Sequence, residues 1–358
     1  MRKIAHMLSA GVAALGLSNA APAAEAPPLP PQHVACPADD PSIICGDSAA
    51  EDMLPLPGTN WVVASAYMGA GGIRLIDRTS RRTIKLPFRA GPDDALDREA
   101  YPTCPGPLPA TVHDKLLTHG LAVAESRGGI HTLYAVHHDT RESIEIFRID
   151  TGKAEPSLTW IGCVVVPGKI GLNSVAPLPD GGFVTTNFLP RGGALETDFA
   201  TLTAGKDTGE LWTWDRRNGW AEIPGSKGSG LNGVEASADG KTIYAASWGR
   251  QSLIRIGRDG SNRTSVSLGF RVDNVHWGQD GKLIAAGQTE GGSKVVAVDP
   301  QTLTVTVLAE RADTPPFASA SVGLQNGDEI WLGSYGWPNI AVAKAAPAGS
   351  PKPQNKVD

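Results

Sequence analysis

The sequence predicts an all-β fold, a six-bladed β-propeller with four-stranded blades around a central channel. Short apolar runs recur along the chain, and a tight-turn dipeptide joins each one to a second β-rich run. Six copies of this unit occur, at irregular spacings near the length of a propeller blade. No long segment has helical periodicity, which disfavours folds that alternate strands with helices. Closing six units into a ring leaves few exposed sheet edges.

The copies join two strand-like segments through Asp-Gly, Asn-Gly, Gly-Gly or Pro-Gly. They are Met53–Ser65, Gly120–His138, Ser174–Phe188, Gly233–Trp248, Asn274–Gln288 and Ser321–Tyr335. Sequences between the copies, such as Glu142–Asp150 and Ser252–Asp259, also have strand character. We therefore expect one propeller domain over residues 36–344, preceded by a Pro/Ala-rich linker (residues 24–35) and followed by a disordered tail (residues 345–358).

Residues 1–23 have the features of a secretory signal peptide. A basic start, Met1–Lys3, precedes the short apolar stretch Met7–Leu17, and Ala21–Ala23 offers a small-residue cleavage site. The other interpretation of this segment is an N-terminal helix of the fold. The signal peptide predicts a periplasmic or secreted protein.

Four cysteines fit export to an oxidising compartment. They are Cys36, Cys45, Cys104 and Cys163, and four cysteines allow three pairings. We expect Cys36–Cys45 and Cys104–Cys163, because the first pair is close in sequence and bounds a Pro-containing loop. No C-x-x-C motif occurs, which disfavours a redox or zinc-binding role for these cysteines.

Composition and missing motifs exclude several classes of function. The 32 Lys and Arg nearly balance the 37 Asp and Glu, so no basic face for a nucleic-acid partner is expected. After the signal peptide no stretch is long and apolar enough for stable membrane insertion. The chain lacks G-x-S-x-G, G-x-x-x-x-G-K and H-E-x-x-H, which disfavours serine esterases, P-loop NTPases and zinc peptidases.

Polar residues stand at the heads of five of the six copies. They are Glu51 with Asp52, His119, Asn173, Asn232, and Asp273 with Asn274, whereas the sixth copy has only small residues there. Equivalent positions in successive blades are related by the approximate axis of the ring. If the repeated run is the innermost strand, these side chains converge at one mouth of the channel. The alternative is that each Asn or Asp is a turn residue bonded to its own backbone.

A converging set of this kind favours a hard cation. The candidate ligands are Glu51, Asn173, Asn232, Asp273 and Asn274. Two carboxylates and three amide carbonyls form an all-oxygen set, which suits Ca²⁺ first and Mg²⁺ second. No Lys or Arg heads a copy, so a metal ion would supply the missing counter-charge. Asp52 would point the other way along a strand, and either holds a second, structural calcium or caps a turn.

Five short motifs stand in order at these heads. They are Glu51-Asp52-Met53, His119-Gly120-Leu121, Leu172-Asn173-Ser174, Leu231-Asn232-Gly233-Val234 and Val272-Asp273-Asn274-Val275. In them the chain resembles the paraoxonase branch of the paraoxonase / gluconolactonase superfamily, calcium-dependent six-bladed propellers that include regucalcin-like proteins. The resemblance runs from about Cys45 to Tyr335. It implies that the five candidate ligands hold a catalytic calcium, that His119 is the general base and that His138, rather than the adjacent His137, supports it.

The chain departs from the family pattern in three places. Ser174 stands where paraoxonases have an aspartate that helps to bind the structural calcium, which puts a second ion in doubt. No cysteine lies beyond Cys163, so the disulfide that ties the two chain ends in paraoxonases is missing. The membrane-associating N-terminal helix of those enzymes is replaced by the predicted signal peptide.

The resemblance implies an exported calcium-dependent hydrolase, a lactonase or arylesterase acting on a small-molecule lactone or ester. In this interpretation the metal polarises the carbonyl and His119 activates water. One alternative is a non-catalytic periplasmic propeller that binds a ligand or a protein partner. Another is a condensing enzyme similar to strictosidine synthase. The segment Leu189–Gly209 is an insertion expected to form a lid or a surface loop. The aromatic residues Trp248, Trp277, Trp331, Tyr335 and Trp337 either line an apolar pocket wall or pack between blades.

Overall fold

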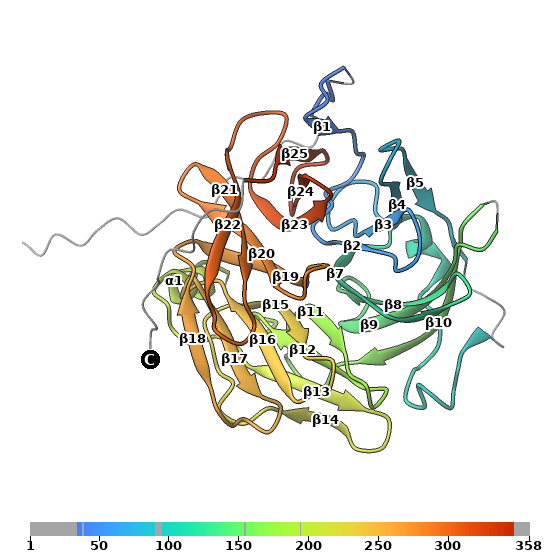
Figure 1. Cartoon of the computed structure of the whole chain (residues 1–358). Coiled ribbons are helices and arrows are strands. Elements are labelled where there is room, and N and C mark those ends of the chain that lie inside the picture. The colour runs from blue at the N-terminus through green and yellow to red at the C-terminus, as the bar shows by residue number, and fades with distance from the viewer. Residues whose placement is uncertain (1–33, 38, 90–94, 154, 194, 347–358) are drawn as a thin grey trace, which may run out of the picture.

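The computed structural model describes residues 34–37, 39–89, 95–153, 155–193 and 195–346. They form six antiparallel sheets arranged as blades around a common centre (Figure 1). The predicted six-bladed β-propeller is confirmed. The predicted signal peptide, most of the predicted linker and most of the predicted tail lie outside the described residues.

In blades 1 to 3 the strands follow in chain order from the centre to the rim. Blade 1 contains β2 (Met53–Pro55), β3 (Trp61–Ala64), β4 (Ile73–Asp77) and β5 (Thr83–Leu86). Blade 2 contains β7 (Thr118–Arg127), β8 (Ile130–His137), β9 (Ser143–Asp150) and β10 (Ser157–Val165), with the short parallel strand β6 (Phe88–Arg89) added at its rim. Blade 3 contains β11 (Leu172–Pro177), β12 (Phe183–Asn187), β13 (Leu211–Asp215) and β14 (Gly219–Glu222).

Blades 4 to 6 complete the ring. Blade 4 contains β15 (Leu231–Ala236), β16 (Thr242–Ser247), β17 (Ser252–Gly257) and β18 (Thr264–Ser267). Blade 5 contains β19 (Arg271–Trp277), β20 (Leu283–Thr289), β21 (Gly292–Val298) and β22 (Val305–Ala312). Blade 6 contains β23 (Ala320–Asn326), β24 (Glu329–Ser334), β25 (Ile340–Lys344) and the N-terminal strand β1 (Ile43–Ile44).

The first strand of each blade is its innermost strand. β2, β7, β11, β15, β19 and β23 lie around the centre (Figure 1) and contact the inner strands of neighbouring blades. Alternating apolar side chains fill the space between sheets; for example, Val184 of blade 3 belongs to the same buried cluster as Val234 and Ile243 of blade 4. The repeats found in the sequence therefore correspond to the two inner strands of each blade.

The pairing of β1 with β25 closes the ring, and two disulfides cross-link segments in the N-terminal half of the chain. β1 pairs antiparallel with β25, with Ile43 opposite Ala341, so the first described strand completes the last blade. Both expected disulfides are present: Cys36–Cys45 lies beside β1, and Cys104–Cys163 joins the segment before a 3₁₀ helix (Ala110–Lys115) to β10. The α-helix α1 (Leu195–Thr203) lies in the predicted insertion. No helix among the described residues has the length and hydropathy to cross a membrane.

A buried ion pair anchors the turn between β8 and β9. The fully buried carboxylate of Glu145 accepts hydrogen bonds from Arg141 at 2.7 and 2.8 Å, from Ser143 at 2.6 Å and from the Trp160 indole at 2.7 Å. Because removing Arg141 leaves this carboxylate buried without a counter-charge, we expect Arg141→Met to lower the free energy of unfolding by about 3 kcal/mol.

Urea denaturation measures this change, with Arg148→Met, an exposed arginine on β9, as the matched control. Equal midpoints for the two variants would contradict the expectation.

Candidate functional site

In blades 2 to 5 the residues at the heads of the inner strands lie in β-bulges. In blade 2, His119 and Gly120 together oppose one residue of β8, because the register moves from Thr118–His137 directly to Leu121–Ala135. The same shift occurs in blades 3, 4 and 5. There the bulged pairs are Asn173 with Ser174, Asn232 with Gly233, and Asp273 with Asn274. A bulge interrupts the strict alternation of side chains, so it redirects residues toward the channel.

Two glycines let neighbouring bulges come close. A Cβ atom on Gly120 would lie 2.4 Å from the carbonyl oxygen of Asn173 in the next blade. A Cβ atom on Gly233 would lie 2.4 Å from the backbone nitrogen of Val275, beside Asn274. Real Cβ atoms do not approach other atoms this closely, so the His-Gly and Asn-Gly pairs of the sequence are needed for the tight packing of the inner strands.

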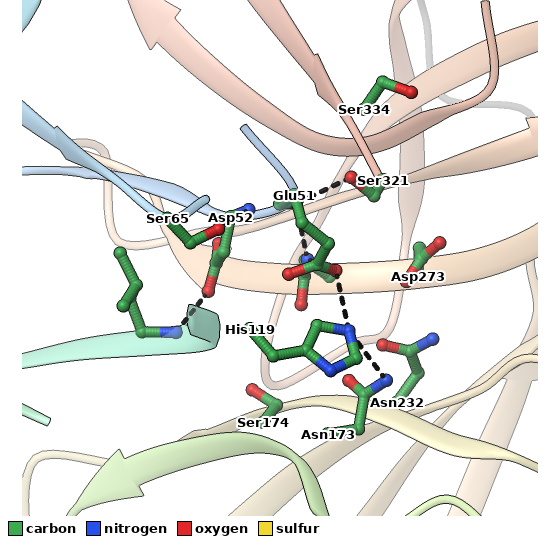
Figure 2. A network of polar contacts seen from close by, with 12 residues as sticks. Glu51, Asp52, Ser65, His119, Asn173, Ser174, Asn232, Asp273, Ser321 and Ser334 are labelled. Atoms are coloured by element: carbon green, nitrogen blue, oxygen red, sulfur yellow. Dashed lines mark hydrogen bonds and ion pairs between the residues drawn. The ribbon is translucent and has the colours of Figure 1, made fainter. Parts of the chain in front are cut away.

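The five candidate ligands come together at this end of the inner strands. Figure 2 shows Glu51, Asn173 and Asn232 with the imidazole of His119 beside them, although they come from separate blades. All five are buried, with relative exposures of 6% or less. The Asn274 amide donates to Glu51 Oε1 at 2.7 Å, and the Ser321 hydroxyl donates to the Glu51 carbonyl at 2.6 Å, so blades 5 and 6 both fix Glu51.

Four oxygens of this set lack hydrogen-bond partners within the described chain. They are Glu51 Oε2, Asn173 Oδ1, Asn232 Oδ1 and Asn274 Oδ1. Buried polar atoms of folded proteins nearly always have a partner, so four acceptors without one in a single place are typical of a site for a cation or an ordered water. The residues therefore fit a hard, oxygen-preferring cation. The described residues contain no metal-binding group of three or more His, Cys, Asp or Glu, and this set has only two carboxylates.

The pKa values of the two carboxylates, Glu51 and Asp273, also fit a cation site. Burial, reinforced by the neighbouring Asp52 carboxylate, raises the pKa of Glu51 well above its usual value. Burial and the charge of Glu51 raise the pKa of Asp273 to about 8. Both pKa shifts reflect the free-energy cost of burying negative charges close to one another. A bound divalent cation would offset that cost.

Asp52 points away from this set and has partners of its own. Its Oδ1 accepts from the Met53 amide at 2.8 Å and from His276 Nε2 at 2.6 Å, and its Oδ2 accepts from the Leu121 amide at 2.7 Å. His276 also contacts Glu235 at 3.1 Å through Nδ1. Although burial opposes its charged form, the Asp52 and Glu235 carboxylates raise the pKa of His276 to about 10. The assignment of Asp52 to a second calcium therefore rests on the sequence alone.

His119 lies between the candidate ligands and His138. Its Nε2 is 3.5 Å from Glu51 Oε1 and 3.5 Å from the Asn173 amide nitrogen, and its Nδ1 is 2.8 Å from His138 Nε2. Tyr67 stacks on its ring with centroids 4.3 Å apart. Burial lowers the pKa of His119 to about 4, so this imidazole is neutral near pH 7. The structure brings His138 to His119, whereas His137 bonds the Leu117 carbonyl at 2.9 Å.

Sequence reasoning missed two residues of this assembly. Glu142 contacts His138 Nδ1 at 2.9 and 3.0 Å, and Arg191 forms an ion pair with Glu142. Glu142 follows the turn after β8, and Arg191 lies in the predicted insertion. No spacing rule links Glu142 to Arg191. The sequence offered one signal for Glu142, because a hairpin turn after His138 would bring the two side chains close together.

A cavity of about 800 Å³ lies over the candidate ligands, and Glu51, His119, Asn173, Asn232 and Asp273 are among its lining residues. Its aromatic lining is Tyr67, Phe188, Phe199, Trp248, Phe270 and Tyr335. Phe199 belongs to α1, so the insertion contributes to the wall of the cavity.

Two of the aromatic candidates lie elsewhere. Trp331 is fully buried, and Trp277 packs against Tyr244. Both side chains pack within the blades and do not line the cavity. A second hollow of about 840 Å³ is lined by residues of the β15–β16 and β17–β18 turns of blade 4, among them Asp239 and Arg258, and by none of the candidate ligands.

Solved structures with a similar fold include enzymes. A luciferin-regenerating enzyme aligns with a TM-score of 0.54 and 15% identity over 86% of this chain and 94% of that structure. A gluconolactonase of Xanthomonas campestris aligns at 0.51 and 17% over 84% and 88%. A PQQ-bound aldose sugar dehydrogenase of Streptomyces coelicolor reaches 0.50 and 14% over 88% and 100%. No protein-family model and no curated protein matches the sequence. At these identities the likeness shows a shared fold.

Proposed function

We propose that this protein is a calcium-dependent hydrolase of lactones or aryl esters. The observation that carries the proposal is the set of four buried oxygens without hydrogen-bond partners, close to the imidazole of His119, beneath a cavity of about 800 Å³ that Glu51, His119, Asn173 and Asn232 line. One of the structures with this fold is, by its name, a gluconolactonase, which agrees with hydrolysis as the reaction class.

Glu51, Asn173, Asn232, Asp273 and Asn274 would hold the cation. When bound, Ca²⁺ supplies a positive charge that polarises an ester carbonyl. His119 presents Nε2 to the same cavity and accepts a proton from water, because its imidazole is neutral. Tyr67 holds the ring of His119 by stacking, and the aromatic walls bind the apolar part of the substrate and exclude water from it.

Removal of calcium tests the proposal. We expect hydrolysis of phenyl acetate and of a panel of small lactones to be lost in EGTA and restored by added calcium, with magnesium restoring less. The melting temperature should fall in EGTA, because a ligand bound only to the folded state stabilises it. No turnover, together with a melting temperature that ignores EGTA, would rule out the metal site and favour a non-catalytic binding propeller.

A further inference from the structure

The carboxylate of Glu142 has donors on three sides. Its Oε1 accepts from the Leu172 amide at 2.6 Å, its two oxygens lie 2.9 and 3.0 Å from His138 Nδ1, and the Arg191 guanidinium forms an ion pair with it. Its side chain is only 7% exposed. An ionised carboxylate can only accept hydrogen bonds, so each of these neighbours must present a hydrogen to it.

This requirement fixes the proton positions on two imidazoles. Because Glu142 only accepts, the proton of neutral His138 must lie on Nδ1, which leaves Nε2 as an acceptor. His138 Nε2 faces His119 Nδ1 at 2.8 Å, so the proton of neutral His119 must lie on Nδ1. The lone pair of His119 then lies on Nε2, on the side of Glu51 and Asn173. The amide nitrogen of Asn173 donates toward this atom at 3.5 Å, in agreement with that tautomer.

The backbone builds this chain of contacts from separate segments. His138 and Glu142 stand at the two sides of the turn between β8 and β9, where Asp139 takes a left-handed conformation with φ 43°. Arg191 comes from the insertion, and Arg141 anchors the same turn to Glu145. A neighbouring cavity of about 600 Å³ is lined by His138, Glu142 and Arg191. His119 lines both this cavity and the one over the candidate ligands, whereas His138 lines only the smaller cavity.

We propose that Glu142 is a positioning residue that sets the tautomers of His138 and His119, so that His119 presents an unprotonated Nε2 to the metal-side cavity. The catalytic consequence rests on the proposed hydrolase function; the tautomers themselves do not. Arg191 assists by holding the Glu142 carboxylate in place. The insertion thus contributes to the orientation of His119, in addition to lining the cavities.

The first test measures the tautomers directly. Histidine-selective ¹⁵N labelling of the calcium-saturated protein gives one pair of imidazole nitrogens per histidine, and His119→Gln and His138→Gln variants assign the two pairs that matter. We expect both rings to be neutral with the proton on Nδ1 in the wild type, and this pattern to be lost at His138 in Glu142→Gln. A proton on Nε2 of His119 in the wild type, or unchanged tautomers in the variant, would overturn the proposal.

The second test separates positioning from folding. We expect Glu142→Gln to lower kcat by about 100-fold, within the range of general-base effects, while KM and the calcium Kd stay within about twofold of the wild type. Glu329→Gln is the matched control and should leave kcat unchanged, because it removes a carboxylate of blade 6 that forms an ion pair with Arg81 of blade 1. Arg191→Met is the second variant, for use if Glu142→Gln does not fold. It alters an exposed side chain, so the fold should be kept, and it should lower kcat several-fold.

The two proposals fail in different ways. Wild-type protein that hydrolyses none of the esters and lactones would overturn the hydrolase function, and the NMR result would still decide the tautomers. Wild-type activity in both Glu142→Gln and Arg191→Met would overturn the role of Glu142 while leaving the hydrolase function intact.

Discussion

Asn232→Ala is expected to weaken calcium binding by about 100-fold or more and to abolish hydrolysis at calcium concentrations that saturate the wild type. The Asn232 Oδ1 has no partner within the described chain, so its loss removes a proposed metal contact and no existing hydrogen bond of that oxygen. The substitution also removes the side-chain hydrogen bond between Asn232 and Asp273. Losing an outer partner of a metal site already costs 10- to 100-fold in affinity, roughly, and a direct ligand should cost at least the upper value.

Isothermal titration with calcium measures this affinity, and thermal denaturation provides a second measurement. Calcium at about one hundred times its Kd should stabilise the wild type by about 2.7 kcal/mol and the variant much less. Asn218→Ala, at an exposed turn of blade 3, is the control and should titrate like the wild type. Equal affinities in Asn232→Ala and Asn218→Ala would remove Asn232 from the site and weaken the case for the whole ring.

His119→Gln is expected to reduce the rate of hydrolysis by about 1000-fold and to leave calcium binding nearly unchanged. The imidazole is neutral, its Nε2 faces the cavity, and its contacts to Glu51 and Asn173 are long, at 3.5 Å. Loss of a general base costs about 10² to 10⁴ in rate. Glutamine keeps a polar side chain beside the buried carboxylate but accepts protons poorly, so the substitution separates proton transfer from metal binding.

Steady-state kinetics at saturating calcium measure this effect. His113→Gln is the control, because His113 bonds the Leu108 carbonyl at 2.9 Å and lies outside the cavity lining. Retained activity in His119→Gln would assign proton transfer to another group, whereas a parallel loss of calcium affinity would give His119 a structural role in the site.

The inner strands were predictable from the sequence because blades repeat. Residues at one position of a repeat must lie at one radius and height in the ring, so aligning the copies was enough to bring Asn173, Asn232 and Asp273 together. The bulges were not predictable in this way. Strand alternation alone would send Asp273 and Asn274 to opposite faces, and only the register shift of β19 explains how both take part.

Contacts between different kinds of segment left no pattern in the sequence. Asp52 was expected either to bind a second ion or to cap a turn, and its contact with His276, more than two hundred residues away, depends on closure of the ring. The same is true of Glu142 and Arg191. They meet because the insertion between β12 and β13 of blade 3 places Arg191 against Glu142 of blade 2. Hydrogen bonds of this type depend on the rotamers of individual side chains, which repeat spacing does not specify.

The pairing of β1 with β25 has a consequence for the order of events during synthesis. All five candidate ligands precede residue 275, yet the Glu51 carbonyl is held by Ser321 of blade 6, and the segment before Glu51 belongs to that same blade. A nascent chain in which all five candidate ligands have already left the ribosome therefore still lacks the assembled candidate site. The last blade contributes no candidate ligand, yet it holds Glu51 in place, so we expect the proposed cation to bind only after this blade has been made.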